Sequence, residues 1–150
     1  MVAAADEHTV GATVTINEFI SSSISGGVAF GSLNPGQALV PAAGQSDNVS
    51  AVIVTVEAET NVLCDITIKG SGNFSDNTST YFMPLGSAKW NNVSNSATAP
   101  DMDTVAAQVG QFTNPGTATP FDVWHWITIP DGQVAAAYST DFIYTVDKTP

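Results

Sequence analysis

The amino-acid sequence predicts an all-β protein: a single β-sandwich, jelly-roll or immunoglobulin-like, of about eight or nine strands with an extended N-terminal strand. Helix signals are almost absent, and short β-rich segments alternate with clusters of Gly, Pro, Asn and Ser. Near the N-terminus, apolar and polar residues alternate strictly, which is the period of a strand with one buried face. A chain of 150 residues also has the size of one domain with a sizeable core.

The N-terminal alternation is unusually long. Its apolar positions are Val10, Ala12, Val14, Ile16, Ile20 and Ile24. From residue 12 to 25, without Pro or Gly, an extended chain could reach about 45 Å, whereas globular strands usually have about 5–6 residues. Such a strand either bends between two sheets or leaves its domain to complete a neighbour's sheet. The second option is our leading hypothesis.

The rest of the chain is divided by turn residues. Gly26-Gly27 is a predicted break, and Asn34-Pro35-Gly36 is a predicted turn because Pro fixes φ and Gly supplies a positive φ. Residues 48–57 have apolar positions on both faces, which predicts a central strand. Further strands are predicted over residues 28–33, 61–69, 81–85, 88–90, 121–129 and 138–146, and residues 104–112 form either a strand or a helical turn.

The charge composition limits the partners of the chain. Only 11% of the residues are charged, the net charge is −11, and three lysines are the only basic residues apart from the two histidines. Nucleic acid and anionic membrane surfaces are therefore not expected as partners, because both require Lys and Arg. No apolar run approaches the length of a membrane span. The first five residues lack the basic and apolar regions of a signal peptide, so we expect the mature form of an exported protein.

The residues capable of catalysis or metal binding form no recognisable set. Cys64 lies on the apolar face of a predicted strand and is expected to be a small core residue. His8 and His125 have no local nucleophile or phosphate loop beside them, so we expect no enzyme, no cofactor and no metal site. The acidic loop at Asp101 and Asp103 could supply oxygen ligands to calcium, but a solvated loop is the simpler interpretation.

Two tryptophans stand out. Alternation places Trp124 and Trp126 on one face of a strand, and His125 on the other, more aliphatic face. The aliphatic face is the expected core, which makes His125 a buried, hydrogen-bonded residue and directs the tryptophans outward. Together with Trp90 they could be covered by loops, form a subunit interface or stack on sugar rings.

Four asparagines begin Asn-x-Ser/Thr sequons. They are Asn48, Asn73, Asn77 and Asn92. Three of them fall in predicted loops, where a glycan could be attached if the protein is exported. In a chain this rich in Asn, Ser and Thr, about two such matches are expected by chance.

Several strings together resemble a known group of proteins. After the alternating N-terminus come residues 28–36 (VAFGSLNPG), the Val/Thr-rich strand at 52–56, residues 61–70 (NVLCDITIKG), residues 124–132 (WHWITIPDG) and residues 137–144 (AYSTDFIY). This order resembles the subunits of archaeal cell-surface threads and bundling pili, and more loosely the TasA-like biofilm fibre proteins of bacteria. The resemblance spans nearly the whole chain.

The resemblance implies a structural subunit of an extracellular filament at the cell surface. In such fibres the N-terminal strand of one subunit inserts into the incomplete sandwich of the next. Here residues 1–17 would be the donor strand and residues 18–150 the β-sandwich, with Glu18 interrupting the apolar face. The side chains entering the next subunit would be those of Val10, Ala12, Val14 and Ile16. Burying them would contribute roughly 6–10 kcal/mol before entropy costs.

The partner would then be the protein itself, in a head-to-tail homopolymer that also meets neighbouring filaments or cells. The alternative from a different functional class is a secreted carbohydrate-binding β-sandwich that uses exposed tryptophans at Trp90, Trp124 and Trp126. That alternative predicts a monomer whose N-terminal strand folds within its own domain. An adhesin or S-layer-associated domain is a third reading, but no attachment sequence supports it.

Overall fold

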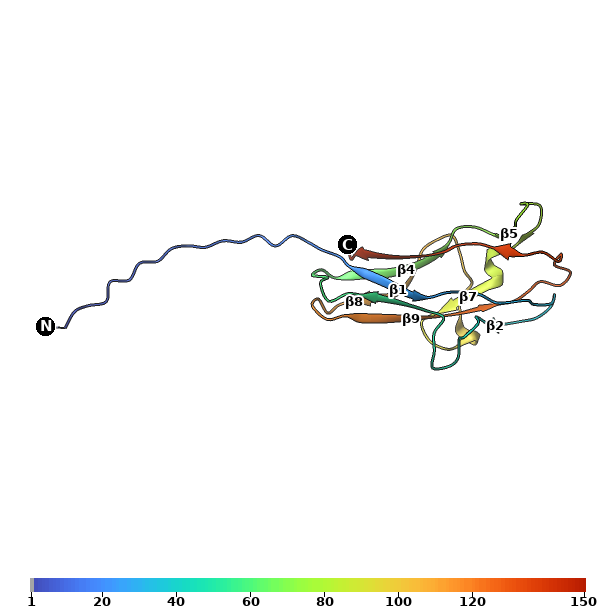
Figure 1. Ribbon diagram of the computed structural model, residues 1–150, viewed down its shortest axis with the longest axis horizontal. Helices are drawn as coiled ribbons and strands as arrows, with labels where there is room; N and C mark the ends of the chain where they lie inside the picture. The colour runs from blue at the N-terminus through green and yellow to red at the C-terminus, as the bar shows by residue number, and fades with distance from the viewer. Residues whose placement is uncertain (1) are drawn as a thin grey trace.

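The computed structural model describes residues 2–150 and is all-β apart from two short 3₁₀ turns (Figure 1). The strands are β1 (Ser22–Gly26), β2 (Val40–Pro41), β3 (Val52–Val56), β4 (Cys64–Gly70), β5 (Phe74–Asp76), β6 (Phe82–Met83), β7 (Ala88–Asn91), β8 (Ala107–Phe112), β9 (Thr119–Ile127), β10 (Tyr138–Ser139) and β11 (Phe142–Lys148). The 3₁₀ turns are η1 (Leu85–Ser87) and η2 (Ser96–Thr98). The prediction of an all-β fold is confirmed.

The strands form three antiparallel sheets. The largest has five strands in the order β1-β3-β9-β2, with β7 also pairing with β9. A second sheet has the order β11-β4-β8, and a smaller one has the order β10-β5-β6. β1 and β11 are thus the end strands of the two larger sheets, each paired on one side within the described part of the chain.

The core lies where the apolar faces of the two larger sheets meet. In β3 the valines at 52, 54 and 56 are buried, while Ile53 and Thr55 are half-buried, as expected of a strand covered on both faces. In β4 the buried positions alternate in the same way, with Cys64, Ile66 and Ile68 inside. The same cluster contains Val109 and Phe112 of β8 and Val123 of β9.

Several sequence predictions agree with this fold. Residues 48–57 do contain a central strand, since β3 lies between β1 and β9. The ambiguous segment 104–112 forms strand β8. The turn at 34–36 is present as well: Gln37 N donates to Asn34 O at 3.3 Å, and Gly36 has a φ of +82°.

Other elements differ from the predictions. The long N-terminal strand is paired only from Ser22 to Gly26, because residues 2–21 have no neighbouring strand within the described part of the chain. Residues 28–33 form no strand. The last hydrogen bond between this segment and the strand region of β3 is from Gly27 N to Ala51 O. Gly26, with a φ of +85°, turns the chain away from the sheet at this point. The total of eleven strands exceeds the predicted number because β2, β6 and β10 have two residues each.

Candidate functional site: an exposed arm and an open groove

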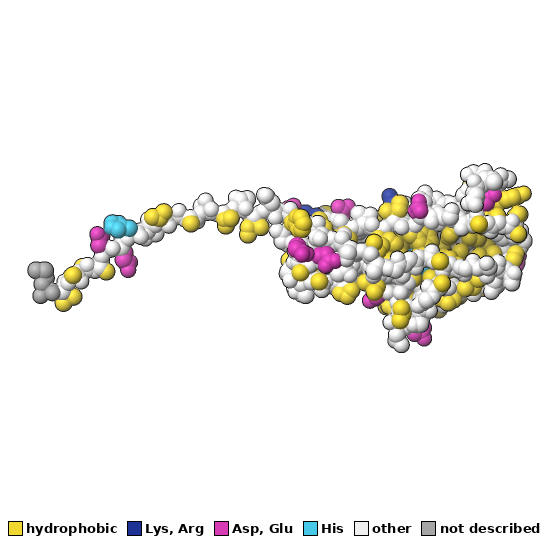
Figure 2. Space-filling model, in the orientation of Figure 1, with side chains coloured by type: hydrophobic (Ala, Val, Ile, Leu, Met, Phe, Trp, Pro, Cys, Tyr) yellow, Lys and Arg dark blue, Asp and Glu magenta, His cyan; other side chains and the backbone are white. Residues whose placement is uncertain are grey.

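The first residues of the chain form an arm that projects from the domain. Figure 1 shows it leaving the end at which β11 also finishes, and Figure 2 shows hydrophobic side chains spaced along it. Val10 is 90% exposed, Val14 86% and Ile16 78%. Among residues 2–150 these side chains are not buried by any other part of the structure, so they are available to another molecule.

The base of the arm is fixed by one asparagine. Asn61 donates from Nδ2 to Asn17 O at 2.9 Å, and its Oδ1 accepts from Phe19 N at 2.8 Å. Beside it, Glu18 forms an ion pair with Lys148 at the end of β11. Asn17 is therefore the first of the described residues that hydrogen-bonds to the folded domain.

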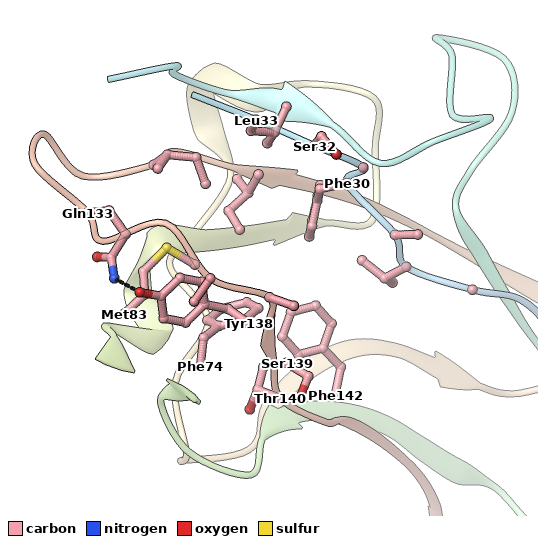
Figure 3. A pocket seen from close by; sticks show the side chains of 18 of the residues that line it. Phe30, Ser32, Leu33, Phe74, Met83, Gln133, Tyr138, Ser139, Thr140 and Phe142 are labelled. Atoms are coloured by element: carbon pink, nitrogen blue, oxygen red, sulfur yellow. Dashed lines mark hydrogen bonds between the residues drawn. The ribbon is translucent and has the colours of Figure 1, made fainter. Parts of the chain in front are cut away.

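The domain contains a groove of about 910 Å³ with a mainly apolar lining. Figure 3 shows Phe30 and Leu33 on one side, facing Tyr138 and Phe142 on the other. One wall is the end of β1 with the segment that follows it, and the other runs from Gln133 through β10 into β11. Residues from the core close its floor, namely Val52, Phe74, Met83 and Ile127.

The β11 wall presents unpaired backbone groups. Ser71 N donates to Asp141 O and Thr149 N donates to Leu63 O, so the odd-numbered residues of this antiparallel pair face β4. The even-numbered residues, which include Phe142 and Tyr144, then direct N–H and C=O away from β4. Their side chains pack toward the core at the same time. This wall can accept another strand without any rearrangement of the existing sheet.

The β1 wall has the same property. Glu57 N donates to Ser21 O and Gly27 N donates to Ala51 O, which assigns the odd-numbered residues to the β3 side. Ile24 therefore has backbone groups on the free edge, and its side chain lines the groove while 57% exposed. Two open strand edges enclosing an apolar groove are an arrangement that soluble proteins normally protect.

A buried histidine holds the aromatic side chains of the β11 wall. His125 of β9 is fully buried, as predicted, and its Nε2 lies 2.5 Å from the Tyr144 hydroxyl oxygen. Its ring also stacks on Phe142, with the ring centroids 5.1 Å apart. Burial lowers the pKa of His125 from its ordinary 6.5 to about 4, and burial also raises the pKa of Tyr144. Both groups are neutral at pH 7.

The groove and the arm lie at opposite ends of the domain. β5 and β2 mark the end farther from the arm in Figure 1. β10, which forms part of the groove wall, pairs with β5 at that end, and Phe74 of β5 contributes to the floor. The arm of a molecule therefore points away from its own groove.

The tryptophans are not the exposed platform that alternation suggested. Trp90 and Trp126 are each 6% exposed, and Trp90 belongs to the main core cluster. Trp124 is half-buried and donates from Nε1 to Ser46 O at 2.8 Å. The loop after β2 closes on β9 through this bond and through His125 N, which donates to Gln45 Oε1 at 2.7 Å. Loops therefore cover the tryptophan face, which removes the surface needed for sugar stacking.

The other candidate site residues, Cys64 and Asp101, have contacts typical of structural roles. Cys64 is fully buried, and burial raises the pKa of its thiol, in agreement with the predicted core role. Asp101 forms an ion pair with Lys89 at 2.5 Å. Among residues 2–150, no three His, Cys, Asp or Glu side chains are grouped to hold a metal ion. Within the same range, no helix has the length and apolar character required to cross a membrane.

The sequon asparagines Asn48, Asn73, Asn77 and Asn92 are all exposed. Two of them also hold loops in place: Asn73 Oδ1 accepts from Leu85 N at 3.0 Å, and Asn92 Nδ2 donates to Val109 O at 3.0 Å. A glycan is attached through Nδ2, so modification of the folded protein at Asn92 would require that bond to break.

The sequence predicts a strand over residues 138–146, which includes Tyr138, Phe142 and Tyr144, but no groove beside it. The structure leaves these side chains half-buried, as one wall of the groove. A usable signal was the apolar run at 134–137, which forms no strand, is exposed and lines the groove. No protein-family model and no curated protein matches this chain, so the arm and the groove carry the functional argument.

Proposed function

We propose that this chain is the structural subunit of an extracellular filament at the cell surface, and that it polymerises head-to-tail by inserting its N-terminal arm into the groove of the next subunit. The observation that carries the proposal is that one molecule has two exposed apolar surfaces, each without a contact partner in the described structure. The arm exposes alternating apolar side chains, and the groove exposes apolar residues between two free strand edges. The low-charge, polar composition is common among exported surface proteins.

In this proposal the two larger sheets are the layers of one β-sandwich, jelly-roll or immunoglobulin-like, that lacks a strand at the seam between β1 and β11. A strand supplied by a neighbour would add its backbone bonds to a free edge and its apolar side chains to the core. Residues 1–17 are the donor and residues 18–150 the acceptor domain. The first bond between arm and domain at Asn17 supports this division.

The dimensions of the two surfaces agree. Residues 10–16 contain the four apolar donor positions and span about 20 Å when extended. The groove wall from Tyr138 to Tyr144 is a segment of equal length. Burying the four donor side chains would contribute roughly 6–10 kcal/mol before the cost of ordering the arm.

The geometry favours an open polymer over a closed dimer. The arm leaves one end of the domain and the groove lies toward the other, so each contact joins different surfaces of the two subunits (Figure 1). Heterologous contacts of this kind build a helical filament, in which every added subunit leaves one arm and one groove unoccupied, unless the rotation between subunits closes a ring. An arm directed away from its own groove also disfavours insertion within the same subunit.

Removing the arm tests the proposal. Residues 2–16 make no hydrogen bond to the rest of the described chain, so a variant lacking residues 1–16 should keep the fold of the domain. The full chain is expected to form filaments by electron microscopy and light scattering, whereas the shortened chain should remain monomeric. A peptide of residues 5–17 should bind the shortened chain, and a peptide with Val10, Val14 and Ile16 replaced by Ser should not.

Filaments from the shortened chain would contradict the proposal, as would a full chain that remains monomeric up to millimolar concentrations. The carbohydrate-binding alternative has no observation in its favour, because Trp90 and Trp126 are buried.

A further inference from the structure

We infer that the incoming arm pairs with β11 in antiparallel orientation, in a register that places Val10 opposite Tyr144 and, continued back along the same wall into β10, Ile16 opposite Tyr138. This inference rests on the proposed filament. It names which strand edge is used, in which direction the donor runs and which residues meet.

The direction follows from the positions of the arm and the groove. β11 runs from the groove toward the arm end of its domain, where Lys148 forms the ion pair with Glu18 (Figure 1). A neighbour's arm enters from the groove end with its N-terminus leading. From N to C, that arm therefore runs back toward the groove end, opposite to β11. The same arm would run parallel to β1, and antiparallel pairing is slightly more stable per residue.

The face of the donor follows from the alternation in β11. Phe142 and Tyr144 direct their backbone groups to the free edge and their side chains into the groove. In an antiparallel pair, residues directly opposite one another point to the same face of the sheet. The even-numbered donor residues, which carry the apolar side chains, must therefore lie opposite the even-numbered residues of β11.

The register follows from the point along β11 at which the lining of the groove ends. Along this wall the lining extends toward the C-terminus as far as Tyr144, and the even-numbered positions that precede it are Phe142, Thr140 and Tyr138. The donor has four apolar positions, and polar residues precede Val10 at His8 and Asp6. Matching the two sets pairs Val10 with Tyr144, Ala12 with Phe142, Val14 with Thr140, and Ile16 with Tyr138. The smallest donor side chain then lies opposite a large aromatic ring.

Charge provides an additional argument for this register. Continuing the pairing by four residues places Asp6 of the donor opposite Lys148. Lys148 is the only basic side chain on β11 and is exposed at the end of that strand, where the donor's Asp6 would share it with Glu18 of the acceptor subunit. A shift of two residues in either direction would move Asp6 away from Lys148, and opposite charges directly across a strand pair are stabilising.

Disulfide trapping tests the register. Thr9 and Thr145 are exposed and would form a non-hydrogen-bonded pair, whose Cα separation of about 4.5 Å suits a disulfide. The full chain with T9C and T145C is expected to give a ladder of covalent oligomers after mild oxidation of filaments, seen on a non-reducing gel. The native Cys64 is buried and should not react.

The matched control combines T15C with T145C. It should give no ladder, because antiparallel pairing separates these residues by about 20 Å along the strand. A ladder of covalent oligomers from the control variant would mean that the arm runs parallel to β11. A cross-linked monomer from the same variant would show that the arm inserts into its own groove. Filaments without a ladder from T9C and T145C would overturn the register while leaving the filament intact. Absence of filaments from the unmodified chain would overturn both the register and the proposed function.

Discussion

Val14→Asp is expected to stop filament growth while leaving the domain as stable as the original. Val14 is 86% exposed in the free subunit, so the substitution removes no intramolecular packing. In the proposed assembly the same position is buried, and an unpaired carboxylate there would lose the Val contribution and add a desolvation cost. A loss of about 3 kcal/mol or more would raise the critical concentration for assembly at least about 100-fold.

Thr15→Asp is the matched control. It adds the same charge one residue away, on the face of the arm that would point to solvent, and should change the critical concentration by less than about threefold at physiological salt. The critical concentration can be read from pelleting assays, and the stability of the domain from urea unfolding. Equal effects of the two substitutions would mean that the arm does not bury one face.

Acid is expected to destabilise the domain through His125. The histidine has a pKa of about 4 in the folded protein and an ordinary value of 6.5 when unfolded. Between these values the unfolded chain takes up a proton that the folded chain does not. The stabilisation is therefore complete above pH 6.5 and is lost as the pH falls toward 4. The total loss from this residue is about 3 kcal/mol.

The contribution of His125 can be separated from that of the carboxylates. His125→Gln retains a hydrogen-bonding side chain opposite Tyr144 but does not titrate in this range. The free energy of unfolding, measured in urea from pH 4 to pH 7.5, should fall more steeply in the original than in the variant. Parallel curves would show that His125 takes up its proton with an ordinary pKa.

Some of the fold was predictable because local patterns determine it. The alternation of β3 reports two covered faces directly, and the Pro–Gly turn at 34–36 is specified by its own residues. The burial of His125 also followed from alternation along β9. The same alternation misplaced Trp126, which is buried, because the period of a strand contains no information about which segments distant in sequence pack against each face.

The groove was not predictable from the sequence, because it lies between two strands, β1 and β11, that do not pair with each other. Its walls, β1 and β11, are more than 100 residues apart in the sequence, and each was predicted simply as a strand. The N-terminal alternation has the period of a strand, but a strand also needs a neighbouring strand to pair with. Within the described chain, that neighbour is present only from Ser22 onward. In the proposed filament, a segment that pairs with a neighbouring subunit would therefore appear in the sequence as an unusually long strand.

The central claim is that the arm of one subunit occupies the groove of another, and a mixture of two incomplete subunits tests it most directly. One lacks residues 1–16 and so has a groove but no arm. The other carries Ile24→Asp, which places a charge in the groove at a side chain that is already exposed and leaves the arm intact. Each alone should be monomeric in analytical ultracentrifugation. Mixed, they are predicted to form a 1:1 dimer and nothing larger, whereas two separate monomers at high micromolar concentrations would contradict the claim.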